Sequence, residues 1–405
     1  MNIYRQTTMH LLGALLYFAL MGIEPIQAFD FKGVHSLVGT RDAVIVSGPD
    51  HRVLFLHNAD TLLVPASTLK LLTALTAFHI LGENYQFRTE FYSDSNSNLK
   101  IKGYGDPLLI SEVIADIAAS LYDLLKDRSY SLSNIIVDST YFDSSVVIPG
   151  VTDTTEPYDS PNGALCVNFN TVNFKTVNGG YVSAEPQTPL LPMTFDRIKK
   201  TGLSRGRITL SHQKDELVLY AGRLFKHFLQ KAGVMVTGKV LPGKVETTDK
   251  RLLRYASPYP LNQVVAKMMT YSNNFMANQI LLEAGIALAG PPGTLQKGIA
   301  AARNYAGNEL GVVGFRISEG SGISRSNRVT ARDLHRILLK FKPHYRLLKQ
   351  EGTDFYKTGT LKNVSTRVGF MGQDETTLYA YVILCNTPGH SATRVRNRLL
   401  EVFGQ

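Results

Sequence analysis

The sequence predicts an α+β fold in which a five-stranded antiparallel sheet carries helices on both faces and is interrupted by a large, mainly β insertion. Three observations predict this fold. Strand-like runs occur near both ends of the chain, a helical segment that is apolar nearly all round follows the first two runs, and a long stretch of alternating strands and turns separates that helix from the next helical region. With 405 residues, of which 44% are hydrophobic, the chain can build a large core and more than one domain.

Residues 1–28 are predicted to be an export signal peptide. Arg5 precedes an apolar run from Leu11 to Ile23, and Ala28 offers a cleavage point. The run is short for a membrane span, so we expect it to be removed rather than to anchor the protein.

The formal net charge of +10 indicates which partners to expect. Removal of the signal takes away only Arg5 and Glu24, so the mature chain keeps this excess. A basic exported protein suits anionic surfaces such as cell-wall polymer or membrane headgroups. Nucleic acid is not an expected partner, because no run of Lys and Arg with interleaved aromatic residues occurs.

The sheet and its helices are predicted in chain order. The predicted strands are 43–46, 53–56, 355–360, 366–371 and 378–384. The predicted helices are 65–81, 261–268, 275–284, 330–341 and 392–403. Because the strands come from both ends of the chain, the sheet closes only when those ends meet.

The stretch between these elements predicts the domain organisation. We predict that 29–84 and 256–405 form one catalytic domain and that 85–255 is inserted into it. Within the insertion we predict strands, turns and one helix, 112–125, with a smaller unit nested near 174–240.

The first turn of helix 65–81 carries the first candidate site. Ser67 and Lys70 are three residues apart and share one face, and Lys70 is the only charged residue between Pro65 and Leu81. In one interpretation Ser67 caps the helix and Lys70 extends its ammonium to solvent. In the other, desolvation leaves Lys70 neutral enough to take a proton from Ser67, which becomes a nucleophile.

Two later motifs favour the nucleophile. Ser272 and Asn274 are two residues apart, so a turn between helices is needed to aim both at one point, and Lys357-Thr358-Gly359 lies on a predicted strand. The order Ser-x-x-Lys, Ser-x-Asn, Lys-Thr-Gly matches the three-part signature of serine penicillin-recognising enzymes.

Within that superfamily the chain resembles the D-alanyl-D-alanine carboxypeptidase/endopeptidase family of class C low-molecular-mass penicillin-binding proteins, peptidase family S13. The resemblance rests on segments spread over nearly the whole mature chain: 65–70, 105–109, 272–277, 319–325 and 357–361. The long gap between the first two motifs also fits the family, in which it holds an inserted domain. The chain departs from the family at Glu319, where Asp is usual, at Cys166, where a small residue such as Ser is usual, and in the shortness of the insertion.

The resemblance implies the roles of the proton-transfer groups. Ser67 would attack the carbonyl between two D-alanines and Lys70 would accept its proton. The backbone N–H groups of Ser67 and Thr360 would stabilise the oxyanion. Ser272 would relay a proton to the leaving amine, and Asn274 would hold Lys70 and a substrate amide.

The strand motif would bind the end of the substrate. Lys357 would present its charge to the terminal carboxylate, with the hydroxyls of Thr358 and Thr360 as further donors. Gly359 would let the strand backbone approach the substrate closely.

The expected function is therefore that of an exported periplasmic serine D,D-peptidase, both carboxypeptidase and endopeptidase. Its partners would be peptidoglycan stem peptides and, as covalent inhibitors, β-lactam antibiotics. Neither a cofactor nor a metal is expected, since the ten histidines show no paired ligand spacing. Two alternatives stay open, namely a catalytically idle peptidoglycan-binding scaffold and a β-lactamase, which the long gap between motifs disfavours.

Two further features have no catalytic part in this hypothesis. Cys166 and Cys385 each lie in an apolar run and are expected to be buried free thiols. Helix 392–403 carries Arg394, Arg396 and Arg398 beside apolar residues, so it is either an ordinary packing helix or a weak peripheral membrane contact. Nothing in the sequence indicates an oligomeric state.

Overall fold

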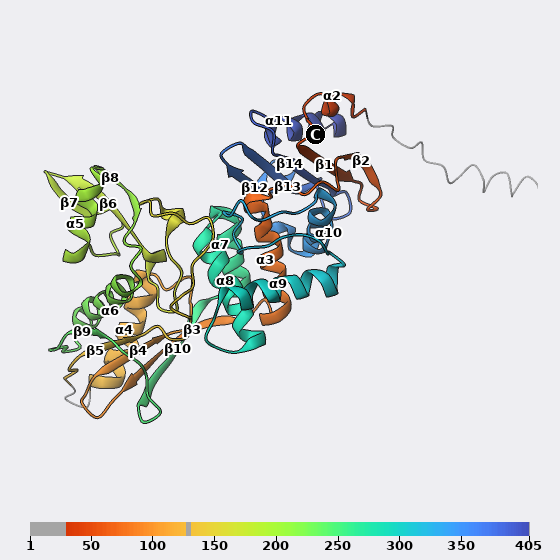
Figure 1. Ribbon diagram of the computed structural model, residues 1–405. Coiled ribbons are helices and arrows are strands. Elements are labelled where there is room, and N and C mark those ends of the chain that lie inside the picture. Colours follow the sequence, from red (N-terminus) through yellow and green to blue (C-terminus); the bar gives the residue numbers. More distant parts are fainter. Residues whose placement is uncertain (1–29, 127–130, 405) are drawn as a thin grey trace, which may run out of the picture.

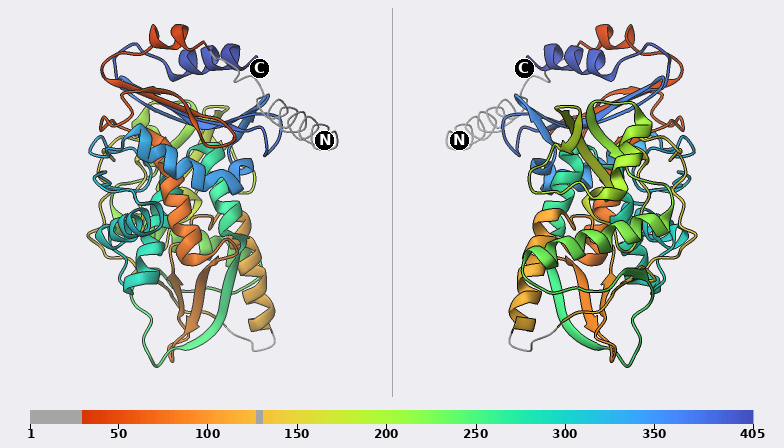
Figure 2. Two further views of the ribbon diagram at one scale, coloured as in Figure 1. Left: turned by 90° about the vertical axis from the view of Figure 1, so that its right-hand side faces the viewer. Right: turned by 90° about the vertical axis from the view of Figure 1, so that its left-hand side faces the viewer.

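The computed structural model describes residues 30–126 and 131–404, and the predicted signal peptide lies outside them. Figure 1 shows a sheet built from both ends of the chain, a group of helices beside it, and the insertion beyond the helices. In Figure 2 the main sheet lies at one end of an elongated molecule and the five-stranded sheet of the insertion lies at the other.

The main sheet contains the five predicted strands and one more. Its strands are β1 (Asp42–Ser47), β2 (Val53–His57), β11 (Lys349–Glu351), β12 (Asp354–Leu361), β13 (Val364–Met371) and β14 (Tyr379–Cys385), in the order β11-β12-β13-β14-β1-β2. All its pairings are antiparallel, and Val44 opposite Ile383 joins the two ends of the chain. The short β11 makes β12 an inner strand over part of its length.

Both faces of the main sheet are covered, which explains why the middle of β1, residues 43–46, is apolar at every position. Ala43 and Ile45 face one core and Val44 and Val46 face the other. One face packs against η1 (Ala66–Leu69) and α10 (Ala331–Phe341). Beyond these lie α3 (Lys70–Leu81), α7 (Leu261–Tyr271), α8 (Asn274–Ala289), α9 (Leu295–Leu310) and η5 (Lys342–Leu347). The other face packs against α11 (Ala392–Phe403), which in turn contacts α2 (Lys32–His35). The predicted helices are thus confirmed, and α9 is an additional one.

The insertion has two sheets of its own. The first orders β10 (Lys250–Pro260), β3 (Gln86–Ser93), β4 (Leu99–Gly103), β5 (Ile135–Asp138) and β9 (Val240–Pro242), and the second orders β7 (Gly180–Ser183), β6 (Thr171–Val177) and β8 (Arg205–Thr209). Its helical elements are α4 (Ser111–Leu125), α5 (Pro192–Thr201), α6 (Lys214–Lys231), η3 (Pro157–Asp159) and η4 (Asn168–Asn170). The expectation of a single helix was wrong: α4 is confirmed, but α5 and α6 also form. The helix α6 buries Leu217, Leu224 and Phe228 at helical spacing.

A second hydrophobic core lies inside the insertion, between α4, α6 and the five-stranded sheet, and includes Phe91, Ile117, Leu224 and Phe225. This core supports the predicted division at 85–255, which stays a prediction. The three-stranded sheet spans only residues 171–209, whereas α6 packs on β5 and β9, so a nested unit would be shorter than 174–240.

The two cysteines are free and buried, as expected. Among the helices in the described part of the chain, none is both long and apolar enough to cross a bilayer.

Candidate active site

Ser67 lies in the short 3-10 turn η1, where the chain passes from the main sheet into α3. The preceding Ala66 has a left-handed backbone, with φ +48°. Two glycines allow other segments to press against this turn. A Cβ on Gly322 would lie 1.8 Å from the Ala66 oxygen, and one on Gly359 would lie 2.7 Å from the Ser67 nitrogen. The nucleophile segment is therefore fixed between the loop 319–324 and strand β12.

Lys70 begins α3 and is completely buried. Its Nζ lies 3.0 Å from Ser67 Oγ, 2.8 Å from Asn274 Oδ1 and 2.8 Å from the Ser321 carbonyl oxygen. Burial lowers the pKa of Lys70 well below its ordinary value, the charge of Lys357 lowers it further, and Glu319 partly opposes both.

This geometry suits an uncharged lysine. A neutral amine has two N–H donors and one lone pair, and Lys70 has two pure acceptors, Asn274 Oδ1 and the Ser321 oxygen, together with one hydroxyl that can act as a donor. When the two acceptors take the N–H bonds, the lone pair is aimed at the Ser67 hydroxyl proton. The arrangement can therefore remove that proton without any rearrangement.

The loop that supplies the Ser321 oxygen is organised by Glu319, which is fully buried. Its carboxylate accepts hydrogen bonds from the backbone N–H groups of Ser321 at 2.6 Å and Gly322 at 2.7 Å. The side chains of Asn327 and Asn278 donate to it at 2.7 and 3.1 Å. Glu319 thus positions a contact of Lys70.

No role for Glu319 was predicted from its motif, although the sequence contains a signal for one. A lone carboxylate in a glycine-rich, otherwise uncharged loop needs buried donors, and Asn278 lies one helical turn after Asn274 on the apolar helix α8. The side chain of Thr73, one turn after Lys70 on the same face of α3, also reaches this loop and donates to the Gly320 oxygen at 2.6 Å.

Ser272 and Asn274 lie in a turn between α7 and α8, as the sequence predicted. Ser272 has a left-handed backbone, with φ +52°, and ends α7. Asn273 caps α8 by accepting the backbone N–H of Met276 at 2.9 Å. This turn aims Asn274 at Lys70 and Ser272 at a second lysine.

That second lysine is Lys357 on β12, only 3% exposed. Its Nζ donates to Ser272 Oγ at 2.7 Å and to the Thr358 oxygen at 2.8 Å. Burial lowers its pKa to about 7, and the charge of Lys349 adds to that effect.

The remaining strand residues lie along β12. β11 pairs with β12 only up to Tyr356, so the edge of β12 beyond that residue has no strand partner among the described residues. Thr358 is half-buried and Thr360 is exposed. Alternation along the strand puts both threonines on the face opposite Lys357 and Gly359, so their hydroxyls reach a ligand only around this edge. The close approach that Gly359 permits in the structure is to Ala66 and Ser67.

The eight predicted site residues thus come together in three parts. Ser67, Lys70 and Asn274 form one hydrogen-bonded group, and Ser272 with Lys357 forms a second. Residues 358–360 continue β12 past Ser67, which Gly359 adjoins. Their chemical roles stay predictions. No cluster of metal-ligating side chains occurs within residues 30–126 and 131–404.

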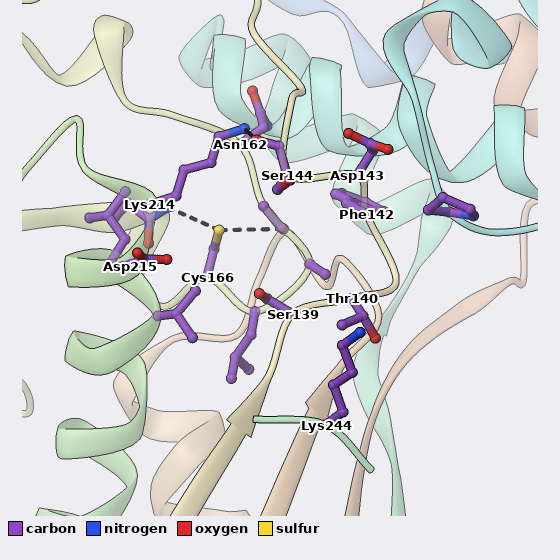
Figure 3. Close-up of a pocket in the computed structure, with 17 residues that line it drawn as sticks. Ser139, Thr140, Phe142, Asp143, Ser144, Asn162, Cys166, Lys214, Asp215 and Lys244 are labelled. Atoms are coloured by element: carbon purple, nitrogen blue, oxygen red, sulfur yellow. Dashed lines mark hydrogen bonds between the residues drawn. The ribbon is translucent and has the colours of Figure 1, made fainter. Parts of the chain in front are cut away.

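A separate cavity of about 400 Å³ lies in the insertion and contains none of these residues. Figure 3 shows Cys166 and Lys214 pointing into it from the loop before η4 and from α6. Cys166 Sγ lies 3.3 Å from the Gly163 oxygen and 2.9 Å from Asn170 Nδ2, and burial raises the pKa of the thiol to about 12. Cys166 is therefore a packing and hydrogen-bonding residue rather than a reactive thiolate.

The three segments converge within an α+β fold of the penicillin-binding-protein type. Residues 35–204 and 197–350 match the model of the D-Ala-D-Ala carboxypeptidase 3 (S13) family. The chain belongs to this family.

Comparison with characterised proteins agrees with this assignment. The chain is 28% identical over 334 residues to a D-alanyl-D-alanine carboxypeptidase of Actinomadura sp. (strain R39), a match that covers 71% of this chain and 62% of that protein. It is 23% identical over 400 residues to the D-alanyl-D-alanine carboxypeptidase DacB of Haemophilus influenzae, with 82% of each chain covered. The chain therefore spans less than two thirds of the length of the Actinomadura relative.

Solved structures share the fold. Penicillin-binding protein 4 (dacB) of H. influenzae superposes with a TM-score of 0.73 at 19% identity, over 92% of this chain and 99% of that one. A second structure of the H. influenzae protein, in complex with a β-lactam, superposes with a TM-score of 0.70 at 18% identity over the same shares of the two chains.

Proposed function

We propose that the protein is an exported serine D,D-peptidase that cleaves D-alanyl-D-alanine bonds of peptidoglycan stem peptides through an acyl-enzyme on Ser67. One observation carries the proposal. A fully buried lysine contacts the Ser67 hydroxyl, and its other two hydrogen bonds go to uncharged acceptors. Burial lowers the pKa of such a lysine and so favours the uncharged amine, which can accept a proton from the partner hydroxyl and make it a nucleophile.

In the acylation step Ser67 Oγ attacks the carbonyl carbon and its proton moves to Lys70. The negative charge that develops on the carbonyl oxygen is stabilised by the backbone N–H groups of Ser67 and Thr360. Removing one proton-transfer group of this kind costs on the order of 10²–10⁴-fold in rate. Asn274 keeps the lysine aimed at Ser67 during the transfer.

Departure of the amine uses the second hydrogen-bonded group. Ser272 gives its proton to the leaving nitrogen, and the proton that Lys70 took from Ser67 replaces it, so both side chains return to their starting protonation states. Lys357, which donates to Ser272 Oγ, stabilises the Ser272 oxygen while the proton moves. The amide C–N bond breaks, the ester to Ser67 remains, and water then hydrolyses that ester. When Lys357 is charged, it also attracts the carboxylate at the end of the substrate.

The free edge of β12 gives the substrate backbone a place to bind. An extended peptide that adds to this edge pairs with backbone groups beyond Tyr356 and brings its scissile carbonyl toward Ser67. A β-lactam that takes the same position would acylate Ser67, and the H. influenzae relative has been solved in complex with one.

The test is mass spectrometry of purified sacculi and muropeptides after incubation with the purified protein, with Ser67→Ala as the control. We expect the wild-type protein to shorten monomers by one D-alanine and to cut cross-linked dimers to monomers, and Ser67→Ala to do neither. Penicillin is expected to add one covalent adduct to the wild-type protein and none to the variant.

Other results would replace this proposal. If Ser67→Ala still accepts penicillin and still releases D-alanine, Ser67 is not the nucleophile. Binding to sacculi without any turnover would indicate an idle scaffold. Rapid loss of the penicillin adduct, with hydrolysed penicillin as the product, would indicate a β-lactamase.

A further inference from the structure

A cavity of about 520 Å³ lies beside the turn that carries Ser272. Tyr271 and Asn273, which flank Ser272 in the chain, line one side of it, and the insertion supplies the other side, including Phe169. None of the eight predicted site residues lines it. The cavity therefore adjoins the candidate active site without being part of it.

The backbone at Phe169 is unusual. Asn168, Phe169 and Asn170 all have left-handed conformations, with φ of +47°, +62° and +56°. Such a conformation costs roughly 1–2 kcal/mol per residue, and asparagine adopts it far more readily than phenylalanine. Strain of this kind persists where the surroundings enforce it, often at binding sites.

Hydrogen bonds on both sides of Phe169 enforce this turn. Asn168 accepts the Ser111 N–H at 3.0 Å and donates to Ser111 Oγ at 2.9 Å. Asn170 lines the neighbouring cavity that contains Cys166, and it donates to Cys166 Sγ and, also at 2.9 Å, to the Pro161 oxygen. The Phe169 ring is thereby held at the cavity wall, 6.1 Å from the ring of Phe275.

The cavity also presents charges of both signs. Glu185 and Arg207 pair with each other. Glu112 on α4 and Lys267 on α7 also line the cavity, and neither forms an ion pair within the described residues. Lys267 Nζ lies 5.4 Å from the centre of the Tyr259 ring. Aromatic walls with one unpaired carboxylate and one unpaired ammonium suit a peptide segment that carries both an amine and a carboxylate.

We propose that this cavity binds the leaving strand of a cross-linked stem peptide, an inference that rests on the proposed D,D-peptidase function. Ser272 protonates the leaving nitrogen, so whatever is attached to that nitrogen extends toward the neighbours of Ser272, Tyr271 and Asn273. In a cross-linked peptide the C–N bond between D-alanine and the side-chain amine of a second peptide breaks, the ester to Ser67 forms, and the second peptide leaves with the proton from Ser272. A single leaving D-alanine is too small to fill the cavity, whereas a second peptide is not.

The experiment compares two substrates in four variants. The substrates are a cross-linked tetrapeptide–tetrapeptide muropeptide and a monomeric pentapeptide muropeptide. Phe169→Ala and Lys267→Glu alter the cavity. Phe195→Ala and Lys199→Glu make the same changes on the exposed face of α5. Because Lys267 is a partly exposed residue of α7, its substitution tests the proposal even if Phe169→Ala impairs folding.

We expect both cavity variants to lower kcat/KM for the cross-linked substrate about 10-fold, mainly through KM, because they remove contacts to bound peptide and not to the reacting atoms. In the cavity variants, kcat/KM for the pentapeptide and the rate of penicillin acylation should stay within about twofold of wild type. Both control variants should have wild-type kcat/KM for both substrates.

Two results overturn the inference while leaving the proposed function intact. One is that the cavity variants change kcat/KM equally for the two substrates, or change it for neither. The other is a wild-type protein that hydrolyses pentapeptide but not cross-linked dimers. If the wild-type protein neither releases D-alanine nor accepts penicillin, the proposed function itself fails and this inference fails with it.

Discussion

Buried lysines in the insertion and at the candidate active site differ in whether a carboxylate lies beside the amine. In the insertion, Lys100 is 8% exposed and its Nζ lies 2.7 Å from the carboxylate of Asp249. At the candidate active site, Lys70 and Lys357 are at least as deeply buried. Neither has a carboxylate oxygen within 4.0 Å among the described residues, and their Nζ atoms contact hydroxyl, amide and carbonyl oxygens instead.

This difference separates a structural lysine from a chemical one. A buried lysine that is paired keeps its charge and fixes the position of its partner. A buried lysine without a counter-ion loses the solvation of its ammonium, so its pKa falls, and burial is the main cause at both Lys70 and Lys357. Burying Lys70 and Lys357 without a carboxylate costs stability, but it lowers the pKa of each lysine and so makes proton transfer by these groups easier.

The largest effect is expected from replacing one lysine of each kind by methionine. Lys70→Met removes the proton acceptor and should slow penicillin acylation of Ser67 by about 10³-fold or more. Lys70→Met also removes a buried amine that has no carboxylate partner. The substitution should therefore leave the unfolding free energy unchanged or raise it by about 1 kcal/mol. Lys100→Met should leave acylation unchanged but lower the unfolding free energy by about 3 kcal/mol, because Asp249 stays buried without its partner.

Acylation rates and urea unfolding of both variants check this prediction, with Lys200→Met, on the surface of α5, as the control. The contrast between the two lysines would be wrong if Lys70→Met were the more destabilised variant, or if Lys100→Met lost acylation.

A second prediction concerns the loop that holds Lys70. Gly322 has φ +87° and a Cβ there would lie 1.8 Å from the Ala66 oxygen, so Gly322→Ala must displace either the loop or the nucleophile. A displacement of about 1 Å at a reacting group can cost about 10²-fold, and we expect a loss of that size in acylation. Gly352 has a similar φ of +61° with no atom within 4 Å of the Cβ position. Gly352→Ala should therefore cost about 1 kcal/mol of stability and leave acylation within about twofold of wild type.

Acylation kinetics and thermal unfolding of the two alanine variants distinguish these expectations. If Gly322→Ala and Gly352→Ala were acylated at the same rate, the contact between Gly322 and Ala66 would not position Ser67.

The motifs of the candidate site are local, so the sequence places the members of each motif near one another. Ser67 and Lys70 lie on one helical turn, and Ser272 and Asn274 lie in one turn between helices, so spacing alone places each pair. The role of Glu319 could not be derived in this way, since its donors come from α8 and from residue 327 as well as from its own loop. Contacts of this kind depend on how elements pack, and a single sequence does not record that.

The fold shows the same limit. β11 has three residues, too few for a strand period to emerge, and it is defined by its pairing with β12. The cavity beside Ser272 combines residues of α4, α7 and the loops of the insertion, whose left-handed turn at 168–170 has no signature beyond its two asparagines. By contrast, α6 carried a helical period in Leu217, Leu224 and Phe228 that the sequence analysis did not use.

The smallest effect is expected from an exposed residue that acts on one of these two lysines. Lys349 on β11 contributes to lowering the pKa of Lys357 to about 7. Charged Lys357 attracts the substrate carboxylate, so kcat/KM should fall as pH rises through about 7. Lys349→Ala removes the repulsion, raises the pKa of Lys357 and should move that fall to higher pH by less than about one pH unit, because an exposed charge acts largely through solvent.

Profiles of D-alanine release between about pH 5 and pH 9 measure this shift, with the exposed Lys340→Ala on α10 as the control. If the pH at which kcat/KM falls is unchanged in Lys349→Ala, or shifts by the same amount in Lys340→Ala, then the titration of Lys357 does not cause that fall. In that case Lys357 would be a structural residue like Lys100, and Lys70 would be the lysine of the site that takes part in proton transfer.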